Sequence, residues 1–299
     1  MMDGLWNLTR RNCKLFFKDK GMFFSSLITP IILLVLYAAF LAKVYKTSFV
    51  SALPSGFAVD ETLINATVGG QLVSSLLAVS CVTVAFCSNL LMVQDKVSGA
   101  ISDITVSPVR RSTIAISYFL ASAAATLIVS FTALGCCFAY LGAVGWYMTV
   151  GDAALMVLDA ALLTLFGVAL SSCVNFPLKT SGQSSAVGTI VSSGYGFFCG
   201  AYMPLASFST GLRTVLSFLP GTYGTSLMRN HAMAGTLREM ERVGFPDDVI
   251  TAIRDSIDCN VYFFGNKVSI PAMYVILCGA IVLLVGLYVL LNTLNGRKR

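Results

Sequence analysis

The chain has 299 residues, of which 56% are hydrophobic and only 11% are charged. A soluble domain carries about 25% charged residues, so this chain has too few charges to cover a folded surface in water. The composition predicts an all-α, polytopic membrane protein and excludes a soluble enzyme, a secreted disulfide scaffold and a free nucleic-acid binder. The formal net charge of +6 then indicates membrane topology rather than a nucleic-acid partner.

Six apolar stretches reach the roughly 20 residues that a helix needs to cross a bilayer. They cover residues 22–42, 67–93, 113–142, 153–173, 183–203 and 270–292. Because six is an even number, both termini are expected on one side of the membrane.

The distribution of basic residues predicts which side that is. Lys and Arg gather in residues 3–20, in the 94–112 and 174–182 loops and in the C-terminal tail, whereas the short loops opposite hold only Lys43 and Lys46. Positive charge in short loops marks the cytoplasmic side. We therefore predict a multi-pass cell-membrane protein, a single domain over residues 1–299, with both termini in the cytoplasm.

Two further segments are predicted to be helical outside the spans. Residues 3–20 mix apolar and basic side chains in a pattern that suits a helix lying in the cytoplasmic interface. Residues 204–269 contain Pro204, Pro220 and Pro246 as breaks, and are expected to form an external cap of short helices between the fifth and sixth spans.

The nine cysteines predict neither a disulfide nor a metal site. Eight of them lie in or beside apolar runs, where cysteine acts as a small hydrophobic residue, and no C-x-x-C pair accompanies the single histidine. Only Cys259 lies in a polar stretch, where we expect a membrane-impermeant thiol reagent to reach it from outside. His231 has no obvious partner and is expected to be an ordinary surface residue.

Motifs for catalysis and nucleotide binding are not found in the sequence. It contains no Gly-x-x-x-x-Gly-Lys-Ser/Thr phosphate loop, no Gly-x-Ser-x-Gly elbow and no His-Glu-x-x-His helix. The predicted spans offer essentially one titratable candidate, Asp159, whereas an embedded enzyme needs a constellation of such groups. The chain is therefore not expected to be an enzyme.

The loop between the second and third spans carries the most specific motif. It reads Gln-Asp-Lys-Val-Ser-Gly-Ala-Ile-Ser-Asp over residues 94–103 and Ser-Pro-Val-Arg-Arg over residues 107–111. This pattern resembles the cytoplasmic signature of the type-two ABC exporter permeases, although Ala100 and Ser102 stand where Thr and Glu are usual. The residues that match are Asp95, Gly99, Asp103, Pro108 and Arg110.

Two other stretches resemble the same family. Phe-Lys-Asp-Lys at 17–20, followed by Pro30, is similar to its entry into the first span, with Lys20 where Pro is usual. An external motif with Pro204, Pro220 and Tyr223 is similar to the segment that follows its fifth span. The resemblance covers residues 1–230 and 270–299, and leaves 231–269 as an insertion.

The resemblance implies a mechanism. Two permease chains, identical or paralogous, would associate in the membrane, each on a separate cytoplasmic ABC ATPase that holds ATP and Mg, so that this chain binds no cofactor itself. The 94–111 loop would dock on the ATPase and transmit its movement; the alternative is a solvated turn whose Arg110 anchors lipid headgroups.

The resemblance implies export, with a lipophilic drug, lipid-like metabolite or peptide as cargo and multidrug resistance as one possible role. A polysaccharide is an alternative cargo. An ion-coupled secondary transporter is an alternative function, although one carboxylate and no convincing repeat argue against it.

Five side chains in the predicted spans are candidates for contact with cargo. Asp159 should face protein, and either contacts a substrate or cation or makes a polar contact between helices, with Thr164 or nearby serines as partners. By the resemblance, Asn89, Tyr195, Phe197 and Phe198 could line a central cavity; helix packing is the alternative.

Overall fold

The computed structural model describes residues 2–37, 43, 46–47 and 60–295, and it is almost entirely helical. The helices are α1 (Met2–Lys18), α2 (Lys20–Leu36), α4 (Glu61–Ser88), α5 (Leu90–Val97), α6 (Ala100–Val106), α7 (Arg111–Val144), α8 (Val150–Asn175), α9 (Ser181–Phe198), the short 3-10 helix η2 (Leu205–Ser207), α10 (Thr210–Leu216), α11 (Pro220–Arg242), α12 (Asp247–Ser256) and α13 (Ile270–Asn295). One antiparallel hairpin of two-residue strands, β1 (Tyr262–Phe263) and β2 (Asn266–Lys267), was not predicted.

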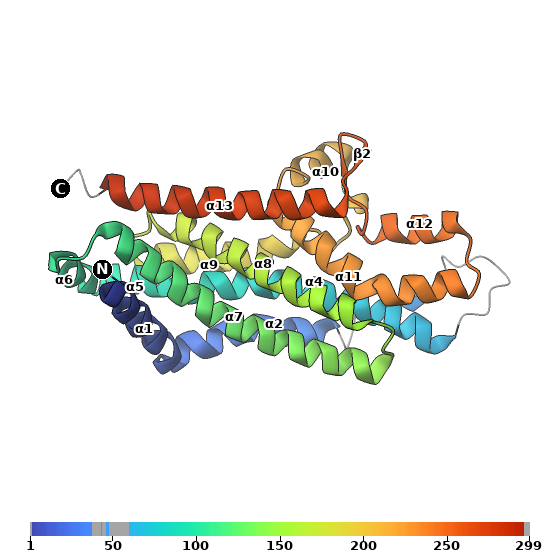
Figure 1. The fold of residues 1–299 in the computed structure, drawn as a ribbon, viewed down its shortest axis with the longest axis horizontal. Coiled ribbons are helices and arrows are strands. Elements are labelled where there is room, and N and C mark those ends of the chain that lie inside the picture. Colours follow the sequence, from blue (N-terminus) through green and yellow to red (C-terminus); the bar gives the residue numbers. More distant parts are fainter. Residues whose placement is uncertain (1, 38–42, 44–45, 48–59, 296–299) are drawn as a thin grey trace.

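The long helices lie side by side around α4, which is the centre of the fold (Figure 1). Nearly every residue of α4 is buried, because α2, α7, α8, α9 and α11 all pack against it. Its contact with α8 is close: a Cβ at Gly167 would lie 2.9 Å from the Val82 Cα atom. Glycine at this crossing lets the two backbones approach, as small residues do between membrane helices.

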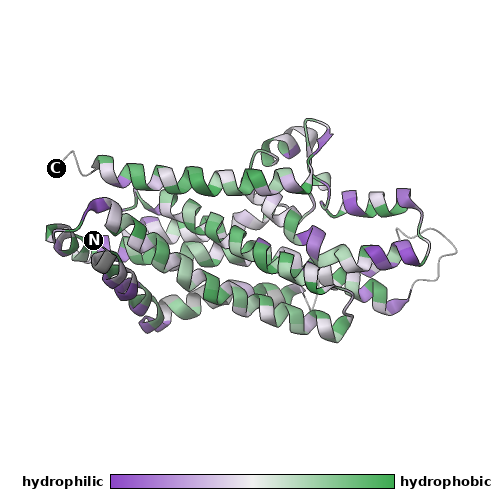
Figure 2. Ribbon diagram, viewed as in Figure 1, coloured by the Kyte–Doolittle hydropathy of each residue, from purple (hydrophilic) through white to green (hydrophobic). Residues whose placement is uncertain are grey.

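Four helical segments in the described part of the chain are long and apolar enough to cross a membrane: Glu61–Val97, Arg111–Val144, Val150–Asn175 and Ile270–Leu294. They correspond to the second, third, fourth and sixth predicted spans. The apolar stretches of these helices run through the middle of the bundle, and the hydrophilic residues of α1 and α12 lie toward its two ends (Figure 2).

The other two predicted spans have a different outcome. Residues 38–42 of the first span lie outside the described residues, and α2 covers only the part up to Leu36. The fifth span is α9, whose 18 residues are rich in serine and glycine and which is not among the four apolar helices. The chain then turns at Gly200, where φ is +74°, a conformation that favours glycine.

The expected external cap needs correction. Residues 204–269 do contain short helices, but α11 is a 23-residue helix that packs between α4, α8 and α13. Its stretch from Gly221 to Met233 is buried, because only Arg229 in this part of the sequence carries a formal charge. Of the described residues in 204–269, α10 and the hairpin lie beside the start of α13, and α12 lies at one end of the bundle (Figure 1).

The two ends of the bundle differ in what they carry. α1, α6 and the last turn of α13 lie at one end, which we call the loop end, and α12 lies at the other, which we call the α12 end (Figure 1). α1 covers most of the segment 3–20, and it packs its apolar face against α7 while Arg10, Lys14 and Lys18 are exposed. At the α12 end, Arg238 of α11 pairs with Asp152, which also closes the capping box of α8.

Cys259 is not the exposed thiol that the sequence suggests. It is 2% exposed, and burial raises the pKa of its thiol to about 12. Since the thiolate is the reactive form, Cys259 should resist thiol reagents whichever side of the membrane it faces.

Two exposed acids allow the orientation to be tested instead. In intact cells, a membrane-impermeant maleimide should label the Asp248→Cys variant, at the α12 end, and spare both wild type and the Asp103→Cys variant, at the loop end. Labelling of Asp103→Cys before the cells are opened would place the loop end outside, against the charge distribution.

Candidate functional site

The segment that joins α4 to α7 forms a compact helical loop. α5 continues from α4 past Asn89, and the chain then turns at Gly99 into α6. Gly99 has φ +83°, and a Cβ there would meet nothing within 4 Å. The glycine therefore serves the left-handed turn, and the space around it is open.

α6 has one packed face and one exposed face. Ile101 and Ile104 pack against a buried cluster that includes Phe16 of α1 and Ile114 of α7. On the other side Asp103 is exposed, and Val106 is 87% exposed. α6 therefore presents an apolar and an acidic side chain away from the bundle.

Further residues extend this exposed face. Val97 is 50% exposed, and Pro108 and Arg110 are exposed in the extended connection to α7. We call the surface formed by Val97, Asp103, Val106, Pro108 and Arg110 the loop face.

Asp95 does not belong to the loop face. It is 5% exposed, its carboxylate accepts two hydrogen bonds from the Arg11 guanidinium, and the Tyr118 hydroxyl donates to it as well. The charge of Asp95 is therefore paired within the chain, between α1, α5 and α7, rather than held free for a basic residue of a partner. A bidentate arginine–carboxylate pair is also geometrically specific.

Lys96 attaches the loop to the end of α8. Its Nζ donates to the carbonyl oxygens of Asn175, Phe176 and Leu178, the closest being Phe176 at 2.6 Å. These carbonyls end α8, where the helix dipole favours a positive charge. Together with the Asp95 cluster, this contact holds the loop on α1, α7 and α8.

Asn89 also has a structural position. It is fully buried, donates to the hydroxyls of Ser171 and Ser172 at 3.0 and 2.7 Å, and accepts from Ser122 at 3.4 Å. These partners come from α7 and α8, so Asn89 ties three helices together and does not line the pocket described below.

Asp159 makes a polar contact between helices, but with unexpected partners. One carboxylate oxygen lies 2.6 Å from Nδ1 of His231 on α11, and the other accepts from the Tyr274 hydroxyl of α13 at 2.6 Å. Thr164 instead donates to Ser130. The expectation that His231 is a surface residue is wrong, because it is 7% exposed and stacks on Tyr274.

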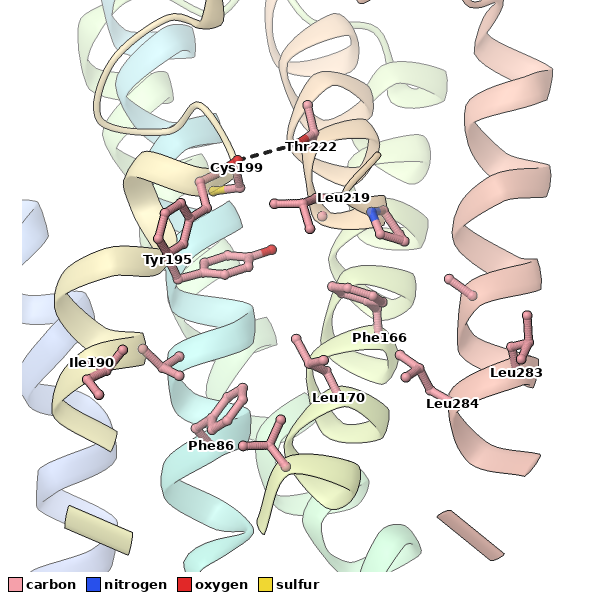
Figure 3. Close-up of a pocket in the computed structure, with 16 residues that line it drawn as sticks. Phe86, Phe166, Leu170, Ile190, Tyr195, Cys199, Leu219, Thr222, Leu283 and Leu284 are labelled. Atoms are coloured by element: carbon pink, nitrogen blue, oxygen red, sulfur yellow. Dashed lines mark hydrogen bonds between the residues drawn. The ribbon is translucent and has the colours of Figure 1, made fainter. Parts of the chain in front are cut away.

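Two of the three predicted aromatic residues line a pocket between α4, α8, α9, α13 and the start of α11 (Figure 3). Tyr195 and Phe198 lie in its wall, opposite Phe166 and Leu284. The pocket has a volume of about 480 Å³. Phe197 lies outside it, half-exposed and packed edge-to-face on Tyr202.

The external motif residues support backbone turns. Pro204 precedes η2, Pro220 is at the first turn of α11, and the hydroxyl of buried Tyr223 donates to the carbonyl oxygen of Ser217 at 2.6 Å. Pro220 also lines the pocket.

Arg229 is a buried residue whose role the sequence analysis missed. It is 1% exposed, donates to the carbonyl oxygens of Gly200 and Ile257 and to Ser75, and pairs with Asp258 at 3.3 Å. Burial raises the pKa of Asp258, and the Arg229 charge acts in the opposite direction. The one signal in the sequence was an isolated charge in a long uncharged stretch.

Metal ligands do not gather anywhere in the described residues: no group of three His, Cys, Asp or Glu side chains there could hold an ion. The described side chains instead form helix-to-helix polar contacts, an exposed loop face and an apolar pocket. This combination defines a helical membrane protein with an apolar pocket and an exposed loop at one end.

Comparison with known proteins now names the class. The family model described as ABC-2 type transporter matches residues 3–232, and the chain therefore belongs to this family of membrane permeases. Membrane subunits of the family generally pair with an ATPase subunit. The matched region includes the loop and α9 and ends within α11, before α12, the hairpin and α13. A comparison with curated proteins finds no match.

The Arg11–Asp95 pair should be measurable in the free energy of unfolding. In a double-mutant cycle with Arg11→Ala and Asp95→Ala, we expect a coupling of about 1–2 kcal/mol, because the acid is buried and bidentate. SDS titration in mixed micelles measures it. The exposed pair Glu239 and Arg242 on α11 is the control and should show a smaller coupling; equal couplings would contradict a special role for Asp95.

Substitution of Asp159 should also lower the free energy of unfolding. Asp159→Ala leaves His231 and Tyr274 without their acceptor in a buried site, which should cost about 1–3 kcal/mol. Asp103→Ala removes an exposed carboxylate and should stay within about 0.5 kcal/mol. The same titration compares the two variants, and a loss in Asp159→Ala no larger than in Asp103→Ala would show that the contact contributes nothing.

Proposed function

We propose that the chain is the membrane-spanning subunit of an ATP-driven exporter, powered by a separate cytoplasmic ABC ATPase that holds ATP and Mg. The loop end then faces the cytoplasm, with both termini. The cargo is a lipophilic drug, a lipid-like metabolite or a peptide. The chain itself is a transport subunit and not an enzyme.

The observation that carries this proposal is the form of the loop. A surface that transmits force must be exposed toward its partner and firmly attached to the elements that move. The loop face meets the first condition, with Val106 at its most exposed point. The contacts of Asp95 with Arg11 and Tyr118, and of Lys96 with the end of α8, meet the second.

A surface turn that only anchors headgroups explains these contacts less well. Such a turn needs basic residues at the interface, which Arg110 supplies. It needs neither a buried carboxylate nor a lysine held by three carbonyl oxygens. The rigid attachment therefore favours coupling to an ATPase over anchoring.

Association with a second copy or a paralogue fits the exposure of α9. Of the residues of this helix, all of which the structure describes, only Ser184 and Gly196 are buried. Its exposed part carries Gly188, where a Cβ would meet nothing within 4 Å, and Ile190, which is 65% exposed and also lines the pocket. Small residues on a membrane helix allow a second helix to approach closely.

An ion-coupled transporter finds less support. Both carboxylate oxygens of Asp159 are engaged by His231 and Tyr274, so the cluster presents no free carboxylate for a driving ion. A polysaccharide cargo also fits poorly, because a sugar chain needs many hydrogen-bonding groups and the walls of the pocket are apolar.

ATP turnover tests the proposal. The purified chain in liposomes should hydrolyse no ATP, and turnover and export should appear only with an ABC ATPase subunit that co-purifies with it. Val106→Asp should lower both co-purification and ATP turnover about tenfold or more, because it places a charge at the centre of the loop face.

Val150→Asp is the matched control. Val150 is 88% exposed, at the opposite end of the bundle, and an acid in the first turn of α8 is favourable for the helix dipole. Turnover by the chain alone, or equal effects of the two substitutions at equal membrane levels, would contradict coupling through the loop face.

A further inference from the structure

α1 carries a continuous exposed stripe on the side that faces away from α7. Asn12 and Phe16 on its inner side are buried, and the apolar residues around them pack against α7 and α2. The exposed aromatic and basic residues opposite follow one another at intervals of three or four, and therefore share one face of the helix. We call them the α1 stripe: Trp6, Arg10, Lys14, Phe17 and Lys18.

The charge of the stripe is not neutralised within the chain. Residues 6–20 hold five basic residues and one acid. One of the five, Arg11, is paired with Asp95, whereas the basic residues of the stripe make no ion pair with any described residue. Their positive charge is therefore available to an anionic partner.

The stripe continues into an apolar surface on α2. The ring of Phe17 contacts Phe23, which contacts Phe24, with centroids 6.0 and 5.7 Å apart. Phe24 is 60% exposed, and Ile31 and Ile32 farther along α2 are more than half exposed. Figure 2 shows the same change from hydrophilic residues on α1 to apolar residues on α2.

This order of side chains matches the layers of a bilayer surface. Basic side chains suit the phosphate groups, aromatic rings lie at the boundary, and aliphatic side chains enter the hydrocarbon. α1 also runs obliquely to the long helices at the loop end (Figure 1), as a helix in the interface would.

We propose that the α1 stripe binds anionic phospholipids of the cytoplasmic leaflet. The basic residues Arg10, Lys14 and Lys18 contact the phosphate oxygens, and Trp6 and Phe17 lie among the glycerol and upper acyl groups. Anionic lipids are chosen over zwitterionic ones because only they bring a net charge that neutralises the stripe. This partner is additional to the ATPase of the proposed function and is bound in its absence.

An acidic protein surface fits the stripe less well. It would pair with Arg10 and Lys14, but it would not cover the exposed side of α2, to which Phe17 connects the stripe. A lipid meets both surfaces, since its headgroup is charged and its acyl chains are apolar.

Competition between two lipids tests the proposal. The purified full chain, without ATPase, is equilibrated in mixed micelles with equal amounts of phosphatidylglycerol and phosphatidylcholine that have the same acyl chains. Native mass spectrometry then counts the bound lipids of each kind. Wild type should retain phosphatidylglycerol in preference, and equal retention of the two lipids would overturn the proposal.

A charge-neutralising variant locates the preference. Arg10→Gln with Lys14→Gln should lower it about five- to tenfold, because each basic residue near a membrane surface adds a several-fold gain in affinity for anionic lipid. Arg10→Lys with Lys14→Arg keeps the charge and should restore the preference. Arg11 stays unaltered in each variant, so that its pair with Asp95 is kept.

The matched control removes the same charge elsewhere. Arg242→Gln with Lys267→Gln changes two exposed residues outside α1 and should leave the preference as in wild type. A preference that survives Arg10→Gln with Lys14→Gln, or that falls equally in the control, would show that the stripe is not the site.

The two tryptophans of the chain provide a second measurement. Trp6 lies on the stripe, and Trp146 lies in the connection between α7 and α8. In nanodiscs, the Trp6 emission of Trp146→Phe should be quenched about twofold more by brominated phosphatidylglycerol than by brominated phosphatidylcholine at the same mole fraction. The Trp146 emission of Trp6→Phe should be quenched equally by both lipids. Equal quenching of Trp6 by the two lipids, or no quenching, would contradict the proposal.

These outcomes are separate from the test of coupling. Lipid preference that follows Arg10 and Lys14 in a chain that supports no ATP-driven export would retain the lipid site and reject the exporter. Loss of the co-purifying ATPase in Arg10→Gln with Lys14→Gln, with an unchanged lipid preference, would assign the stripe to the ATPase and overturn the lipid site.

Discussion

The ion pair between Arg11 and Asp95 determines how the loop end is built. A buried carboxylate is tolerated only when its charge is compensated, and here the compensation comes from a helix more than 80 residues earlier in the chain. α1 is therefore held against α5 and α7 by charge as well as by apolar packing. The position of α6, and with it the loop face, depends on this contact.

The same constraint recurs along the bundle. Asn89, Asp159 and Arg229 are all buried, and each has at least one partner on another helix. Apolar helices can pack against one another in many similar registers. Buried polar contacts fix one register, since a shift of one helix along its neighbour would leave a donor or an acceptor unpaired. This accounts for buried polar groups at positions where the sequence offered only isolated candidates.

The loop face and the pocket lie on different parts of one framework. α4 continues into α5 at one end and supplies Phe86 to the pocket wall nearer the middle. α8 ends where Lys96 binds it, and also carries Phe166 and Leu170 into the pocket. The loop is therefore attached to two of the helices that line the pocket, and the proposed coupling to an ATPase would act through them.

The sequence by itself determined the features that depend on composition and local pattern. Long apolar runs fixed four helices of membrane-spanning length, the amphipathic pattern of residues 3–20 indicated α1, and the motif at 94–111 identified the family that the comparison confirms. Each of these features lies within a short stretch of chain. It depends on the free energy of transferring its side chains from water to an apolar phase, or on local turn preference.

The tertiary structure alone decided which polar residues meet. Asp95 pairs with Arg11, Asp159 with His231 and Tyr274, and Arg229 with Asp258, although the partners lie from 29 to 115 residues apart in sequence. It also decided that α11 packs inside the bundle and that Tyr195 lines a pocket while Phe197 does not. Such pairings depend on how whole helices are turned about their axes, and that rotation is set by packing against all neighbours at once rather than by any local pattern.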